Sequence, residues 1–179
     1  MSATNDHIGR SVYAASRALA WLGGVLLVLI TAISVISIAG RALSGLGLGP
    51  VPGDFELVEM GTALAVFSFL PWCHLKGGHA MVDMFWNAYP GWLRRGVIVL
   101  TDVLTLGVWT LLIWRMAAAM LEYRDNGETT FILHMPVWWG YAAAMLPGVG
   151  GCLVYAWRLL ESLGLARRPQ GFVIESGGH

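Results

Sequence analysis

Four long apolar segments, separated by short polar stretches, make up most of the chain. The first covers residues 18–40 without a charged side chain and is bounded by Arg17 and Arg41. A hydrocarbon core about 30 Å thick needs about 20 helical residues to cross it, and this segment is long enough. Because lipid offers no partner for backbone polar groups, a crossing segment must be helical. The other three apolar segments cover residues 57–75, 96–114 and 136–157.

This pattern predicts an all-α membrane protein with four transmembrane helices in one domain, residues 1–163. The polar residues 164–179 would then form a flexible cytoplasmic tail. The first segment could instead be a cleaved secretory signal, since Ser37-Ile38-Ala39 resembles a cleavage site. Its apolar run is longer than the usual signal core of about 7–15 residues, which favours an uncleaved anchor.

A different pattern lies between the second and third segments, at residues 79–92. His79 and Asp83 are four residues apart, on one face of a helix, whereas the aromatic residues Phe85, Trp86 and Trp92 lie on the other. This predicts a short amphipathic helix in the plane of the membrane interface, with the three aromatic residues as anchors in the lipid. The alternative is a structured loop packed on the bundle.

Basic residues predict the orientation, because they concentrate in cytoplasmic loops. With four spans, eight basic residues fall on the side of both termini and three on the other, which places both termini in the cytoplasm. The eight are Arg10, Arg17, Lys76, Arg94, Arg95, Arg158, Arg167 and Arg168, and the three are Arg41, Arg115 and Arg124. The formal net charge is zero, so nothing points to nucleic acid as a partner.

Asp102 is the candidate for a functional polar group inside the membrane. Counted from Gly96 at about 1.5 Å per residue, it lies about 9 Å inside the third segment. A carboxylate at that depth is expensive and faces a partner or a cavity. It could serve in a proton or cation relay, but a single carboxylate makes a poor relay. A structural pairing is favoured, with Arg17, His74 or Lys76 as the candidate partner.

Other residues are candidates for structural contacts rather than chemistry. Glu59 lies near the outer side of the membrane, away from Asp102. It could pair there with Arg41 or Arg115, or bind an ion. A stripe of small residues in the fourth segment would let another helix approach closely, in this chain or in a partner. The stripe consists of Gly140, Ala144, Gly148 and Cys152.

No catalytic motif, metal cluster or cofactor site is expected. His74, His79 and His134 suggest haem by residue type only, because no two of them face each other at a matched depth. Cys73 and Cys152 lie in apolar stretches and are expected to be buried thiols. An enzyme is therefore not expected.

Three stretches of the chain resemble the small membrane subunit, or Q subunit, of tripartite ATP-independent periplasmic (TRAP) transporters. The first is residues 56–75, where an acidic start leads into an apolar span. The second is Gly78-His79-Ala80-Met81-Val82-Asp83, similar to the family's Gly-His-x-x-Val-Asp. The third is residues 127–148, with Thr129, Thr130, Pro136, Trp138, Tyr141 and Pro147.

The resemblance implies a scaffold subunit in a bacterial inner membrane, in contact with its lipids. It would pair with a large elevator-type membrane subunit that holds the substrate and sodium sites, and with a periplasmic solute-binding protein. The cargo would be an organic acid of the dicarboxylate or sialic-acid type, with no substrate site on this chain. Two alternatives remain: the small membrane subunit of a tripartite tricarboxylate transporter, and a haem- or quinone-binding anchor of a redox enzyme.

Overall fold

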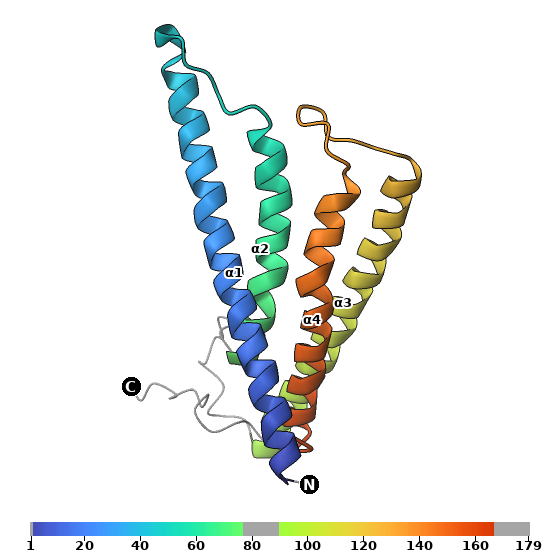
Figure 1. Ribbon diagram of the computed structural model, residues 1–179. Helices are drawn as coiled ribbons and strands as arrows, with labels where there is room; N and C mark the ends of the chain where they lie inside the picture. The colour runs from blue at the N-terminus through green and yellow to red at the C-terminus, as the bar shows by residue number, and fades with distance from the viewer. Residues whose placement is uncertain (1, 77–89, 167–179) are drawn as a thin grey trace, which may run out of the picture.

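The computed structural model describes residues 2–76 and 90–166, and four long helices dominate this part of the chain (Figure 1). They are α1 (Ser2–Ala42), α2 (Asp54–Lys76), α3 (Gly91–Asp125) and α4 (Trp138–Ser162), with a short 3-10 turn, η1 (Ser44–Leu46), after α1. Each long helix is sufficiently long and apolar to cross a membrane. The predicted all-α class with four spans is confirmed.

The observed helices are longer than the apolar segments that predicted them. α1 has 41 residues and α3 has 35, or about 62 and 52 Å at 1.5 Å per residue. Both exceed a hydrocarbon core of about 30 Å, so their ends project beyond it. The helices extend beyond the predicted spans because hydropathy marks the membrane limit, whereas a polar residue does not stop a helix. In particular, α4 continues past Trp157 to Ser162.

The helices pack in the spatial order α1, α2, α4, α3. We call the end where α1 and α3 begin and α2 and α4 end the base, and the opposite end the top. In Figure 1 the helices converge at the base, where the N-terminus lies, and the α1–α2 pair leans away from the α3–α4 pair towards the top. The base is therefore the place where residues from all the long helices can meet.

Small residues bring the helices close together. A Cβ on Gly23 of α1 would lie 3.0 Å from the carbonyl oxygen of Ala65 in α2. A Cβ on Gly140 of α4 would lie 2.9 Å from Met60, and one on Gly148 would lie 2.5 Å from Ile113 of α3. The small-residue stripe predicted in the fourth segment, with Gly140, buried Ala144 and Gly148, therefore packs within this chain.

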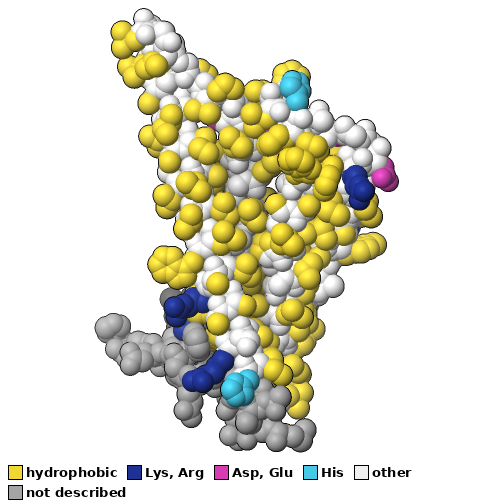
Figure 2. Space-filling model, viewed as in Figure 1, with side chains coloured by type: hydrophobic (Ala, Val, Ile, Leu, Met, Phe, Trp, Pro, Cys, Tyr) yellow, Lys and Arg dark blue, Asp and Glu magenta, His cyan; other side chains and the backbone are white. Residues whose placement is uncertain are grey.

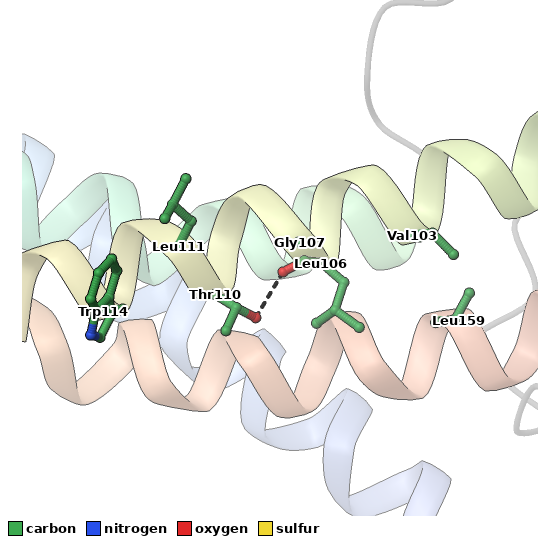
Figure 3. A pocket seen from close by; sticks show the side chains of 7 residues that line it. All are labelled: Val103, Leu106, Gly107, Thr110, Leu111, Trp114 and Leu159. Carbon is green, nitrogen blue, oxygen red and sulfur yellow. Dashed lines mark hydrogen bonds between the residues drawn. The ribbon is translucent and has the colours of Figure 1, made fainter.

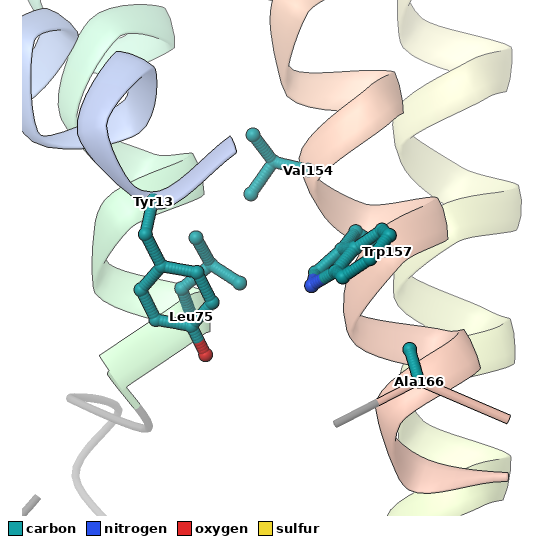
Figure 4. Packing of buried hydrophobic residues seen from close by; sticks show 5 residues of the cluster. All are labelled: Tyr13, Leu75, Val154, Trp157 and Ala166. Atoms are coloured by element: carbon teal, nitrogen blue, oxygen red, sulfur yellow. The ribbon is translucent and has the colours of Figure 1, made fainter. Parts of the chain in front are cut away.

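A hydrophobic core closes the base. Its buried members are Tyr13, Leu75, Val154, Trp157 and Ala166, and in Figure 4 Tyr13 and Leu75 face Val154 and Trp157 across the bundle. Gly164 has φ +80°, the left-handed conformation that ends many helices. This turn brings Ala166 back into the core, whereas the preceding Leu165 is 68% exposed, so only the last of the described tail residues is packed. The remainder of the predicted tail lies outside the described residues.

Apolar side chains cover most of the face seen in Figure 2, and Lys and Arg side chains are visible near the base. The predicted interfacial helix falls mainly on residues 77–89, so His79, Asp83, Phe85 and Trp86 lie outside the described part of the chain. Trp92 is described and is not part of a separate interfacial helix, whereas its role as an anchor in the lipid stays a prediction. It belongs to the first turn of α3, where 75% of it is exposed.

Candidate functional site

Asp102 lies in a buried polar network at the base, where it faces two other helices. One carboxylate oxygen is 3.2 Å from Nε2 of His74 in α2, and the other is 4.0 Å from Nε of Arg158 in α4. The side chains of Asp102 and His74 are only 5% and 6% exposed. Since Asp102 itself is in α3, this one carboxylate joins three helices.

Glu161 extends the network to the remaining helix. Its carboxylate accepts hydrogen bonds from Tyr13 Oη of α1 at 3.2 Å and from Trp157 Nε1 of α4 at 2.9 Å. Arg158 Nη1 donates to the same carboxylate at 3.4 Å. Arg158 therefore lies between the carboxylates of Asp102 and Glu161, and residues of all four long helices meet in a single network.

The charges of this network explain why it can stay buried. Two carboxylates at Asp102 and Glu161 share the guanidinium of Arg158, and the imidazole of His74 lies against the first of them. A buried charge is tolerated when it is paired, whereas removing one partner leaves the other uncompensated at a high cost. The arrangement therefore holds four helices in one relative position.

A layer of aromatic rings covers the network on the side of the membrane interior. Trp109 of α3 has its ring centroid 5.1 Å from that of Phe67 and 4.8 Å from that of Tyr155. Tyr155 in turn lies 4.8 Å from the ring of His74. The indole Nε1 of Trp109 donates to the carbonyl oxygen of Gly148 at 2.8 Å. The network is thus capped by packed rings, an arrangement suited to a rigid joint.

The sequence pointed to part of this network and missed the rest. His74 was a candidate partner of Asp102, and the structure places it there. Arg158 and Glu161 were missed because the fourth apolar segment was taken to end at Trp157. The sequence did contain a signal for them. Glu161 follows Trp157 by four residues and Arg158 by three, so a helix that continued past residue 157 would place all three on one face.

The chain as a whole matches one family of transport proteins. A family model described as "Tripartite ATP-independent periplasmic transporters, DctQ component" matches residues 27–165, which include all of the network except Tyr13. The chain belongs to the DctQ family. No curated protein and no solved structure matches it at a significant level. The match confirms the resemblance to the small TRAP subunit, and so favours a TRAP transporter over the tricarboxylate-transporter alternative.

The top of this DctQ protein is held together by the first turn of α2. Asp54 accepts a hydrogen bond from Ser37 and lies 3.8 Å from Arg41, both in α1. The two oxygens of Glu56 accept the backbone N–H groups of Ile132 and Leu133, at 2.6 and 2.9 Å, and so fix the loop before α4.

Glu59, the residue predicted to make such a contact, is exposed instead. Among the described residues, no ion pair joins it to Arg41 or Arg115. The prediction was wrong because α2 begins at Asp54, before the apolar segment, and so its earlier carboxylates face the neighbouring elements.

Two of the three histidines considered for haem, His74 and His134, lie at opposite ends of the bundle of this DctQ protein. His74 is part of the network at the base, whereas His134 lies in the loop at the top. Within residues 2–76 and 90–166, no group of three His, Cys, Asp or Glu side chains is arranged to hold a metal ion. Cys73 and Cys152 are free, partly buried thiols.

Proposed function

We propose that this DctQ protein is a scaffold subunit of a sodium-driven TRAP transporter for organic acids, and that it moves no solute by itself. It would pair with a large elevator-type membrane subunit, which holds the substrate and sodium sites. A periplasmic solute-binding protein would deliver the solute to that pair. The chain itself would carry no cofactor, no substrate site and no enzymatic activity.

The proposal rests on the observation that the buried charged side chains bind one another between helices. Asp102, Arg158 and Glu161 are engaged with one another and with His74 and Tyr13, at one end of the bundle. Secondary transporters bind solute near the middle of the bilayer, on interrupted helices with exposed backbone groups. Here the polar groups lock helices together, which is what a fixed scaffold needs when a partner moves against it.

Reconstitution tests this proposal directly. Liposomes containing this chain alone should take up no organic acid under a sodium gradient, because the network offers no site for a solute. Liposomes containing the large membrane subunit as well, with the solute-binding protein added outside, should take it up. Sodium-driven uptake by the small chain alone would refute the scaffold role.

We also propose that the base faces the cytoplasm, in the bacterial inner membrane. Six of the eight basic residues on the predicted inner side are described, and all six lie in the half of the bundle nearer the base. They are Arg10, Arg17, Lys76, Arg94, Arg95 and Arg158. A reporter fused after Ser176 should remain cytoplasmic, and one inserted at residues 45–53 should reach the periplasm. A periplasmic reporter at Ser176 would contradict this orientation.

A further inference from the structure

One face of α3 carries a long groove that this chain does not fill. Two hollows, of about 500 and 550 Å³, lie along the helix and share Val103. In Figure 3, Val103 of α3 and Leu159 of α4 point towards each other beside the first hollow. We call the two together the α3 groove. Its lining residues are Trp92, Arg95, Gly96, Val99, Leu100, Val103, Leu106, Gly107, Thr110, Leu111, Trp114 and Leu159.

Two glycines help to form the α3 groove. A Cβ added to Gly96 or to Gly107 would meet nothing within 4 Å, so each glycine leaves open space on the surface. They are eleven residues apart, or about three turns, and so lie on the same face of the helix. Val103 and Leu111, on that face, are 47% and 54% exposed. The hydroxyl of Thr110 donates to the backbone carbonyl oxygen of Leu106 in the same helix (Figure 3). Its donor is therefore used within α3 and does not make this part of the groove polar.

The length of the groove indicates what would fill it. From Gly96 to Trp114 the helix rises about 27 Å, which is nearly the whole hydrocarbon thickness of about 30 Å. Exposed tryptophans, Trp92 and Trp114, lie at its two ends, at the depth where tryptophan meets the headgroups. A lipid chain occupies one leaflet, whereas a transmembrane helix crosses both.

We infer that the α3 groove receives a transmembrane helix of the large TRAP membrane subunit. Helices in lipid associate by close van der Waals packing, and glycines that let backbones approach are the usual means. The glycines of α4 are already used within the chain, against Met60 and Ile113, whereas Gly96 and Gly107 face outwards. Beside the groove, the network at Asp102 fixes α3 to α4, so the groove is presented on a rigid support. This inference rests on the proposed function and adds the face that makes the contact.

Photocrosslinking tests whether the α3 groove contacts the large membrane subunit when the two chains are expressed together. The photoreactive residue p-benzoylphenylalanine placed at Val103 or Leu111, in the groove, should crosslink to the large membrane subunit. The same residue at Val108, which is 57% exposed on another face of α3, should crosslink several-fold less, and so should Val28 of α1. Crosslinking to lipid alone from the groove positions, or stronger crosslinking from Val108 or Val28, would overturn the inference.

Filling the groove provides a second test. Gly107→Leu should reduce the large subunit that copurifies by about tenfold, because overfilling a packed contact is destabilising. Gly24→Leu is the matched control: Gly24 of α1 is also an exposed helical glycine whose Cβ would meet nothing within 4 Å. Both variants should keep the melting temperature of the isolated chain.

The outcomes separate the inference from the function on which it rests. Undiminished copurification of Gly107→Leu would overturn the assignment of the α3 groove and leave the scaffold role standing. If the parent chain does not copurify with the large TRAP membrane subunit at all, the proposed function fails and this inference fails with it.

Discussion

Asp102→Leu should destabilise the isolated chain by about 3 kcal/mol and lower the amount of assembled transporter. Breaking a buried ion pair costs about 3–5 kcal/mol, and the low end applies because Glu161 still faces Arg158 in the variant. His74 also loses its carboxylate partner, at a position where its side chain is 6% exposed. Denaturant titration of the purified chain, followed by tryptophan fluorescence, measures the loss.

Asp102→Asn is the matched control, because an amide has nearly the shape of the carboxylate and can still hydrogen-bond. The remaining charges, Arg158 and Glu161, balance each other. This variant should assemble and support most of the parental uptake. If Asp102→Asn assembles normally but abolishes sodium-driven uptake, then the carboxylate serves as a relay, and its purely structural role is wrong.

Gly151→Ala should be the most damaging single-methyl change in α4. Its Cβ would lie 2.7 Å from the indole of Trp109, which is 4% exposed and lies between Phe67 and Tyr155. The ring cannot withdraw easily because its Nε1 is hydrogen-bonded to Gly148. Overfilling of this kind costs about 1–3 kcal/mol. A lower melting temperature and a changed near-ultraviolet circular dichroism of Trp109 should report it.

The neighbouring residue, Gly150, provides the control for this prediction. A Cβ there would meet only the side chain of Leu19, at 3.6 Å, an ordinary contact distance. Alanine is a better helix former than glycine by about 1 kcal/mol, so Gly150→Ala should be neutral or stabilising. Equal effects of the two substitutions would mean that the contact between Gly151 and Trp109 does not limit the packing of α3 against α4.

The sequence was most informative where a single physical constraint acts along the chain. Lipid requires long apolar helices, so the apolar segments 18–40, 57–75, 96–114 and 136–157 predicted four membrane-crossing helices, and the described part of the chain has four helices of sufficient length and apolarity. The same rule marked Asp102 as a costly group that needs a partner, and His74 was among the candidates. The stretches 56–75, 78–83 and 127–148 together pointed to the family, and the match over residues 27–165 confirmed it.

Only the tertiary structure decided which side chains meet. Arg158 and Glu161 lie beyond residue 157, where hydropathy ended the fourth span, so no partner was predicted for them, whereas α4 continues and turns them towards Asp102 and Tyr13. In the same way, the pattern of small residues did not distinguish Gly148, which packs against Ile113, from Gly107, which faces open space. Local sequence determines that a helix forms and which part of it is apolar enough to cross the membrane. Which face of it meets a neighbour depends on the order and tilt of all the helices, and that order is a property of the packed bundle.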